Sequence, residues 1–311
     1  MAEPLYPDTR APVTARQTLS IVIPTLNVEA IIARCLESLR WADEVVIVDM
    51  FSTDRTREIC ESYPNVCFLQ KQDYIFANVN YGMEIARGDW VMRLDSDEVP
   101  TPELAREIQE EVLARPAVPY NTYWVPNRFY FSGKWLKFGP AFHPQARGTG
   151  YDFRKILFRK GTAHYVVKSE HEDIVASGPF GWLKYPYDHY SMLTVSAWVA
   201  KLNYYTDRDV ERKTAAECAA VRFAPGSLLW RFFRDFASLY VRRQGFRDGA
   251  HGLAACFLHS LQPAVEVIKT WERQWKATEG VRDQGSGVSP NETSNSSDPS
   301  PLTPDPRSEA T

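Results

Sequence analysis

The sequence predicts an α/β protein with a mostly parallel central sheet flanked by helices and a helical appendage at its C-terminal end. Over residues 18–100, short apolar runs of strand length alternate with stretches of helical periodicity. This alternation is typical of strand–helix–strand units, which build parallel sheets. The apolar runs 45–48 and 90–94 each lead directly into an acid, Asp49 and Asp95. Because parallel strands end at one edge of a sheet, we expect these acids where open α/β sheets bind ligands.

Four short strands and three helices are expected before residue 100. The strands are expected at 21–23, 45–48, 66–69 and 90–94, each a short apolar run bounded by turn-forming residues. The helices are expected at 29–41, 53–63 and 78–86, where apolar residues recur at helical spacing. Pro24 is expected to stop the first strand, and Ser52 or Thr53 to cap the second helix.

The second half of the chain differs from the first in composition and in hydrophobic pattern. A helix is expected at 102–113, followed by strands rich in aromatic and β-branched residues at 123–131, 156–158 and 165–167. Further helices are expected at 193–213 and 228–241, and the latter is sharply amphipathic. The uncharged stretch 249–265, with 17 residues, falls short of a membrane span.

These elements divide the chain into four parts. The first is expected to be a flexible extension, and the last, rich in Ser, Pro, Asn and Thr, cannot bury enough apolar surface to stay ordered. Between them lie one large domain, with a first half at 18–100 and a second at 101–192, and a helical region. The four parts are 1–17, 18–192, 193–277 and 278–311.

Composition bounds the class of protein. With 311 residues, of which 44% are hydrophobic, the chain is long enough for one large domain and an appendage. Its net charge of −3 provides no basic field, so no nucleic-acid partner is expected. Five cysteines without a C-x-x-C pair indicate reduced thiols, and the N-terminus has no apolar signal core. We therefore expect the catalytic part in the cytoplasm.

Asp95 and Asp97 form a D-x-D pair at the end of a predicted strand. Carboxylates crowded at one sheet edge repel each other unless they share a cation. Such a pair suits a hard divalent ion with oxygen ligands, of the kind that also holds phosphates. Taken alone, three letters are more often a solvated turn, but their place after a buried strand points to a site for a metal and a nucleotide.

Four segments together resemble the family 2 glycosyltransferases with the GT-A (Rossmann-like) fold. They are Leu19-Ser20-Ile21-Val22-Ile23-Pro24-Thr25-Leu26-Asn27, then Asp49 with Ser52-Thr53-Asp54, then Asn80 with Ala86-Arg87-Gly88-Asp89-Trp90, and finally Leu94-Asp95-Ser96-Asp97-Glu98. The resemblance covers roughly 18–190 and is specific as a set. It is closest to bacterial enzymes that build lipopolysaccharide core or capsule. It implies an inverting, metal-dependent hexosyltransferase that moves a sugar, with glucose a candidate, from a UDP-sugar to a lipid-linked bacterial surface glycan.

The resemblance also implies roles for single residues. Asp97 would hold Mn²⁺ or Mg²⁺, with Asp95 as a further ligand or, together with Ser96, a ribose contact. Asp49 would accept the imide N–H of uracil. Arg93 lies inside an apolar strand, where an unpaired charge is costly, so it is expected to pair with an acid or with the donor diphosphate. The remaining donor-binding candidates follow the first strand or face the donor: Pro24, Thr25, Leu26, Asn27, Glu29 and Asn80.

Several of these residues have structural readings as well. Glu29 suits the first turn of a helix as well as it suits a ribose. Ser52 and Asp54 are expected to shape a turn and a helix start rather than to touch ligand. His171 and His189 are weaker candidates for a metal or phosphate, and a partly buried, satisfied imidazole is the more ordinary role of both.

Direct displacement also requires a base for the acceptor hydroxyl. The resemblance aligns His171-Glu172, with Gly178 downstream, to a His-Glu segment of the family. Glu172 is therefore the expected base and Glu170 the second choice. Without the resemblance, four ionisable residues in a row would be read as a solvated turn.

Departures from the family pattern keep two other functions open. Met50 and Phe51 stand where the family usually has a small or acidic residue and then Gly, so an altered loop is expected there. Residues 139–151 depart as well, which leaves acceptor choice open. A catalytically degenerate sugar- or nucleotide-binding module is one alternative. A nucleotidyltransferase is the other, although no Gly-rich, Lys- or Arg-bearing loop follows the first strand.

The amphipathic stretch 228–247 places arginines beside an aromatic face. This pattern is typical of a helix lying on an anionic membrane, and equally of a helix packed on the catalytic domain with a solvated arginine face. Lipid-linked acceptors favour the first reading. The expected partners are thus a UDP-sugar, a glycan or lipid-linked acceptor, and the inner face of the cytoplasmic membrane.

Overall fold

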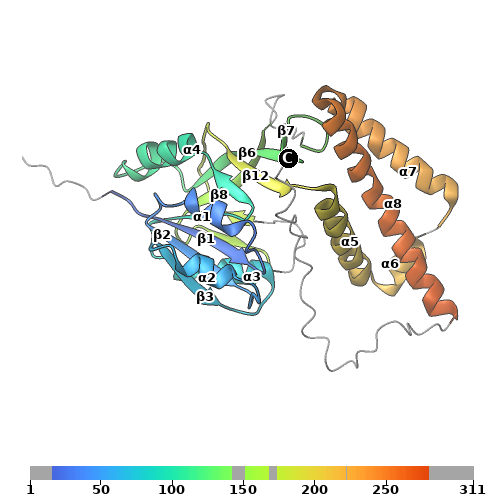
Figure 1. The fold of residues 1–311 in the computed structure, drawn as a ribbon, viewed down its shortest axis with the longest axis horizontal. Coiled ribbons are helices and arrows are strands. Elements are labelled where there is room, and N and C mark those ends of the chain that lie inside the picture. The colour runs from blue at the N-terminus through green and yellow to red at the C-terminus, as the bar shows by residue number, and fades with distance from the viewer. Residues whose placement is uncertain (1–15, 142–150, 168–173, 222, 280–311) are drawn as a thin grey trace, which may run out of the picture.

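The computed structural model describes residues 16–141, 151–167, 174–221 and 223–279. A curled central sheet with helices on both faces forms one part, and a group of C-terminal helices lies beside it (Figure 1). The predicted α/β class is confirmed. The predicted N-terminal extension and C-terminal tail lie almost entirely outside the described residues.

The central sheet runs in the order β3-β2-β1-β4-β8-β6-β12-β5, with β7 and β11 paired to β6. The first four of these strands are parallel, and antiparallel pairing begins where β4 meets β8. A separate hairpin joins β9 and β10. The strands are β1 Leu19–Thr25, β2 Glu44–Asp49, β3 Val66–Gln70, β4 Trp90–Arg93, β5 Glu98–Pro100, β6 Thr122–Phe131, β7 Lys134–Leu136, β8 Asp152–Arg159, β9 Ala163–Tyr165, β10 Ile174–Ala176, β11 Phe180–Trp182 and β12 Tyr187–Met192.

Helices cover the two faces of this sheet over two separate cores. One core packs α1 and α4 with its π-helical continuation against one face, and the other packs α3 and the β9–β10 hairpin against the opposite face. Ile21 and Ile23 point into the first core and Val22 into the second, as the alternation along a strand requires. The helices are α1 Ile32–Glu37, α2 Thr56–Glu61, α3 Ile75–Ile85, α4 Pro102–Glu107 with Ile108–Leu113, α5 Val195–Arg212, α6 Ala215–Ala220, α7 Pro225–Ala237 with Ser238–Arg242, and α8 Gly249–Glu279.

Two local predictions were wrong. Strand β1 continues through Pro24 to Thr25. The proline is tolerated because β4 pairs with β1 only as far as Val22, so no bond to β4 is lost. Helix α2 begins at Thr56, after the predicted caps, because Ser52 and Thr53 bond to other residues of the loop instead.

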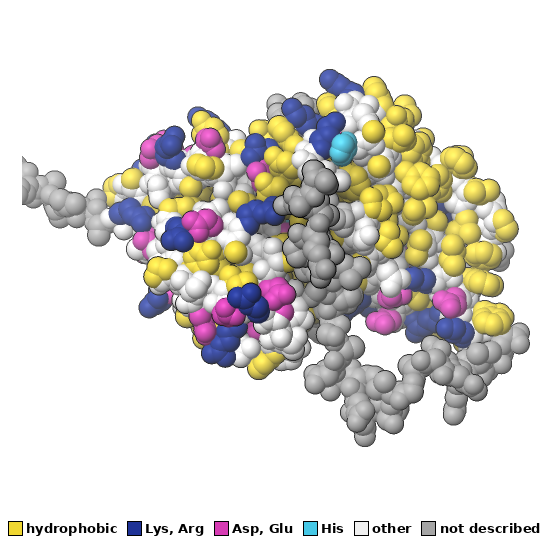
Figure 2. Space-filling view, in the orientation of Figure 1, with side chains coloured by type: hydrophobic (Ala, Val, Ile, Leu, Met, Phe, Trp, Pro, Cys, Tyr) yellow, Lys and Arg dark blue, Asp and Glu magenta, His cyan; other side chains and the backbone are white. Residues whose placement is uncertain are grey.

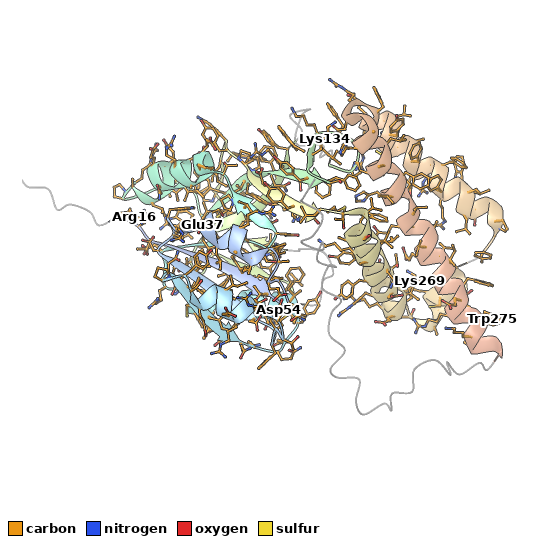
Figure 3. The ribbon with its side chains drawn as sticks, viewed as in Figure 1. Arg16, Glu37, Asp54, Lys134, Lys269 and Trp275 are labelled. Carbon is orange, nitrogen blue, oxygen red and sulfur yellow. The ribbon has the colours of Figure 1, made fainter. Side chains whose placement is uncertain are left out.

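The C-terminal helices are attached to the sheet through α8. Ala255 of this helix packs on Phe131 and Leu136, and the Lys134 ammonium donates to the backbone oxygen of Asp248 at 2.7 Å (Figure 3). The uncharged stretch 249–265 is the first half of α8, a 31-residue helix with Pro263 inside it. Among the described residues, no helix is long and apolar enough to cross a membrane.

Candidate active site

The candidate site lies where β1, β2 and β4 end side by side. Strand β1 is paired to β2 on one side and to β4 on the other, and Thr25 lies opposite Asp49 at the end of the β1–β2 pair. Asp95 and Asp97 follow β4, with Ser96 and Asp97 in a turn. The topology therefore brings the predicted acids to one edge of the sheet.

Asp49 is fully buried and its carboxylate is occupied. It accepts hydrogen bonds from the Thr25 hydroxyl at 2.9 Å, from the Ser52 hydroxyl and backbone N–H, and from the Gln70 amide at 3.2 Å. These contacts hold the loop that follows β2. A base-reading role for Asp49 therefore requires one of them, of which the Gln70 contact is the longest, to be exchanged for the base.

The loop after Asp49 makes its turn without the glycine usual in the family. Phe51 has a φ of 61°, in the left-handed region that ordinarily favours glycine, and its ring is exposed. Asn27 also has a positive φ and bonds across to this loop: its N–H donates to the Ser52 hydroxyl, and its side-chain oxygen accepts the N–H of Thr53. The strained residue is held by this network rather than by its own preference.

Glu29 and Asp54 both bind backbone at the start of α2. The Glu29 carboxylate accepts the N–H of Arg55 at 2.9 Å, and Asp54 accepts the N–H groups of Glu29 and Thr56, each at 3.0 Å. Figure 3 labels Asp54 in the loop ahead of this helix. These contacts give Asp54 the turn-shaping role expected of it, and they satisfy Glu29 structurally.

Asp95 and Asp97 are both flanked by cationic side chains. Arg93, with 2% of its surface exposed, donates to Asp95 at 2.8 Å and lies over the ring of Tyr165. The Asp97 carboxylate lies 3.6 Å from His189 and 3.5 Å from the ammonium of Lys201. The expected pairing of Arg93 with an acid is confirmed.

The charges of this cluster are set by burial and by these pairs. Burial raises the pKa of Asp97, but His189 and Lys201 outweigh it and hold that pKa well below its usual range. Asp97 is therefore an anion. The pKa of Glu98 is shifted in the other direction, since burial and the neighbouring Asp95 raise it to about 7. Glu98 accepts the N–H of Asp95 at 2.9 Å, so it helps to fix the backbone that carries Asp95 and Asp97.

Three residues of this cluster were not predicted as site residues from the sequence. Glu98 was quoted only as part of a motif, and Lys201 and Arg154 were not singled out. Arg154 lies 4.0 Å from Glu98, and Lys201 comes from α5, about a hundred residues after the acid that it faces. No local pattern marks such a residue, because its role depends on where α5 packs.

The structure describes Asn80 but not the residues expected to provide the base. Asn80 joins α3 to β9: its amide donates to the backbone oxygen of Tyr165 and accepts the N–H of the same residue, both at 2.8 Å. Its amide is thus already used. Glu170, His171 and Glu172 lie outside the described residues. Pro24 and Thr25 are buried in β1, and Leu26, Asn27 and Ser96 are half-buried at the sheet edge.

The described side chains at this edge could bind a metal only together with other ligands. In the described ranges, no three His, Cys, Asp or Glu side chains form a cluster that would hold a metal by themselves. Asp95 and Asp97 nevertheless supply carboxylate oxygens from two positions of one short segment after β4. Mg²⁺ is usually held by one or two carboxylates together with substrate phosphates and water. The donor set therefore fits an ion shared with a diphosphate rather than an all-protein site.

A cavity of about 290 Å³ opens beside this cluster and is lined by Trp124, Phe153, Arg154, Lys155, Tyr165, Ile174 and Val175. It shares Tyr165 with the Arg93 contact and Arg154 with the Glu98 contact. A larger cavity of about 630 Å³ lies between α4 and β11 and contains none of the predicted site residues. Through Tyr165 and Arg154, the smaller cavity borders side chains that contact Arg93 and Glu98.

Comparison with known proteins identifies the family of the domain that contains this site. Residues 20–171 match the model of Glycosyl transferase family 2. The lipopolysaccharide core biosynthesis glycosyltransferase LpsC of Rhizobium meliloti is 26% identical over 85% of this chain and 96% of its own length. A protein of Rickettsia bellii named as an uncharacterized glycosyltransferase is 24% identical over 86% and 90%. A crystal structure of S. aureus TarS, residues 1–349, is 16% identical over 87% of this chain and 94% of that one, with a TM-score of 0.40. Residues 20–171 of the chain accordingly form a domain of the family 2 glycosyltransferases.

Proposed function

We propose that this enzyme transfers a sugar, with glucose a candidate, from a UDP-sugar to a lipid-linked bacterial surface glycan such as lipopolysaccharide core, with inversion at the anomeric carbon. The observation that carries the proposal is the convergence of Asp49, Asp95 and Asp97 at one edge of the sheet. The name of the LpsC relative supports the acceptor class. Inversion is an expectation from the family.

The donor would lie across the ends of β1, β2 and β4. Asp49 would read the uracil imide N–H by exchanging its contact with Gln70, the longest of its hydrogen bonds at 3.2 Å. Arg93 and Lys201 keep positive charge beside the acids, and although burial lowers the pKa of His189, Asp97 outweighs burial and raises it. That charge offsets the negative charge that develops on the leaving diphosphate as the acceptor oxygen attacks the anomeric carbon.

Asp97 and Asp95 would hold Mn²⁺ or Mg²⁺ together with the donor phosphates. When bound, such an ion stabilises the charge of the leaving diphosphate without a proton transfer. The acceptor hydroxyl would lose its proton to Glu172, with Glu170 the second candidate. Glu172 precedes Ile174, which lines the small cavity, by two residues in the chain.

The lipid-linked acceptor brings a membrane surface into the proposal. Helix α7 has no buried residue, and Leu229, Trp230 and Phe233 are 60%, 67% and 59% exposed. Figure 2 shows apolar side chains gathered over the part of the molecule formed by α7 and α8. Arg231 and Arg242 are exposed on the same segment. An apolar face bordered by arginines suits peripheral contact with the anionic inner face of the cytoplasmic membrane.

The donor site is tested by thermal shift with UDP, GDP, CDP and ADP, each with and without Mn²⁺. Of the four nucleotides, we expect only UDP to stabilise the protein, by about 2.7 kcal/mol at a hundredfold excess over Kd. The thermal shift should be larger when Mn²⁺ is present. Asp97→Asn should lose the Mn²⁺-dependent part and at least about a hundredfold in transfer rate, since an oriented charge acting on the transition state is removed. Asp207→Asn, the same change at an exposed acid of α5 that lies outside the site, is the matched control.

The other outcomes discriminate the alternatives. Selectivity for another nucleotide would keep the fold but remove the role given to Asp49. No shift with any nucleotide would favour a degenerate binding module. Release of inorganic pyrophosphate from a nucleoside triphosphate would instead identify a nucleotidyltransferase. Unchanged turnover of Asp97→Asn in the presence of Mn²⁺ would contradict the metal role.

A further inference from the structure

Four side chains outside the acid cluster lie together on one face of the sheet, and of these Trp182 is exposed and the other three are half-buried. Trp124 on β6 lies opposite Lys155 on β8 and opposite Trp182 on β11, and cross-strand partners project to the same face. Phe153, two residues before Lys155 on the same strand, projects to that face too. We call Trp124, Phe153, Lys155 and Trp182 the aromatic platform.

The rings of the platform are ordered by contact with one another. Trp124 and Trp182 are stacked at 5.3 Å between centroids and 13° between planes, and Phe153 meets Trp182 edge-on at 5.1 Å. Trp182 is nevertheless 53% exposed, and the neighbouring Phe180 is 42% exposed. Large apolar rings held in fixed positions with a face open to solvent are typical of a surface that receives a ligand.

Lys155 adds a positive charge to this surface. Its ammonium lies 5.4 Å from the centre of the Trp124 ring and 5.9 Å from that of Phe180. Within the part of the chain that the structure describes, these rings are its contacts, and no carboxylate forms an ion pair with it. The charge is therefore available to an anionic group lying on the rings.

The platform is connected to the catalytic edge through the small cavity. Trp124, Phe153 and Lys155 line that cavity together with Tyr165 and Arg154. Tyr165 carries the Arg93 guanidinium, which pairs with Asp95, and Arg154 lies 4.0 Å from Glu98. A molecule that extends from the platform into this cavity thus meets side chains that contact Arg93 and Glu98.

We propose that the aromatic platform is a subsite for an anionic saccharide unit of the acceptor, which carries a carboxylate or a phosphate. The inference rests on the proposed transferase function and names its acceptor chemistry. The apolar C–H face of a pyranose packs on the exposed indoles, and Lys155 pairs with the anionic substituent. A cavity of about 290 Å³ lies at the lower end of ligand-site volumes, which suits a sugar unit rather than a lipid chain.

The test is calorimetric titration of the full chain with three probes. Digalacturonic acid carries carboxylates, glucose 6-phosphate carries a phosphate, and cellobiose is neutral. We expect the anionic probes, or one of them, to bind at least about tenfold more tightly than cellobiose. Trp182→Ala should weaken binding of every saccharide roughly tenfold through loss of one stacked ring. Lys155→Gln should abolish the preference for the anion and leave cellobiose unaffected.

Controls separate this subsite from folding and from the donor site. Trp275→Ala and Lys276→Gln change the same residue types on α8, where Trp275 is 47% exposed, and should leave all three affinities unchanged. Every variant should keep the thermal shift with UDP. Saturating UDP should not displace the anionic probe.

Each contrary result has one meaning. Equal affinity of charged and neutral probes, no effect of the two platform variants, displacement of the probe by UDP, or no saccharide binding would overturn the subsite. If UDP still binds in such a case, the transferase proposal stands. If anionic saccharides bind through Trp182 and Lys155 while no nucleotide binds, the subsite stands and the transferase proposal fails.

Discussion

Several polar residues of the family-like motifs prove to be structural partners of one another. Glu44 is 6% exposed and accepts hydrogen bonds from the Ser20 hydroxyl and from the backbone and side chain of Arg87. Burial raises the pKa of Glu44, but these bonds outweigh it and lower the pKa. Its contribution to stability is thus present above the unfolded pKa and is lost as the pH falls through the folded one. The Ala86-Arg87-Gly88 motif therefore fixes β1 to β2 and need not touch ligand.

His259 on α8 is a second group whose effect on stability becomes unfavourable as the pH falls. Its Nε2 is out of contact with solvent and has no hydrogen-bond partner among the described residues, and burial lowers its pKa to about 4. Below the unfolded pKa of about 6.5 the unfolded chain binds the extra proton, so stability falls by about 1.4 kcal/mol per pH unit down to the folded value.

We therefore expect His259→Phe to remove this share of the acid destabilisation. The phenyl ring keeps the edge-on contact with Trp198 and cannot titrate. The measurement is chemical denaturation of both proteins at pH values between about 4 and 7. His259→Gln serves as a second variant, since it removes the proton site without the ring. Equal slopes for wild type and both variants would contradict the assignment.

At the scale of elements, Asn80 fastens α3 to β9 through two backbone hydrogen bonds, and β9 carries Tyr165 into the cavity wall. Asn80→Ala should cost about 1–3 kcal/mol of stability, because two backbone groups of Tyr165 lose their partner. Asn80→Asp keeps the acceptor and should cost less. Denaturation midpoints and donor KM are the readouts. A raised KM with unchanged stability would instead support the donor contact expected from the sequence.

Helix α3 approaches β1 closely at Gly82. A Cβ at this position would lie 2.5 Å from Cγ1 of Val22 and 3.0 Å from Cγ2 of Val48. Alanine improves helix propensity by up to about 1 kcal/mol, but overpacking a tight core typically costs 1–3 kcal/mol. We expect Gly82→Ala to destabilise the protein on balance. Adding Val22→Ala should recover part of the loss, measured as a favourable coupling in a double-mutant cycle.

At the scale of the whole molecule, hydrophobic periodicity was enough to predict the order of strands and helices. The second half was predicted less fully. Strand β8 was expected only at 156–158, and β5, β7, β10, β11 and β12 were not expected, since their pairing depends on distant segments. The residues of the site were likewise predicted only in part. The D-x-D acids and Arg93 were found from local pattern, whereas Lys201 faces Asp97 only because α5 packs there. Asp49 was found, but not that its carboxylate is already saturated.

The C-terminal helices are an integral part of the packed molecule. Ala255 of α8 contributes to the core with Phe131 and Leu136, and Asp248 accepts the N–H groups of Lys137 and Phe138. On the inner side of the helical group, Lys269 of α8 bonds to Asn203 and Asp207 of α5 (Figure 3). Deleting residues 226–311 would thus open a core as well as remove the apolar face of α7. Substitutions confined to that face test membrane contact more cleanly.

The α7 face, defined by Leu229, Trp230 and Phe233, is exposed, so replacing all three with Ser should leave the fold intact. We expect the wild type to sediment with phosphatidylglycerol vesicles and the triple variant to stay in the supernatant, because apolar burial in the interface is lost. Arg231→Gln with Arg242→Gln should weaken binding to anionic vesicles by about 1 kcal/mol per charge and remove most of its salt dependence. Val199→Ser on α5, which is 49% exposed in the wild type, is the control for a changed apolar surface elsewhere. If the wild type stays in the supernatant with these vesicles, the α7 face does not dock on lipid, and its arginines only solvate the helix.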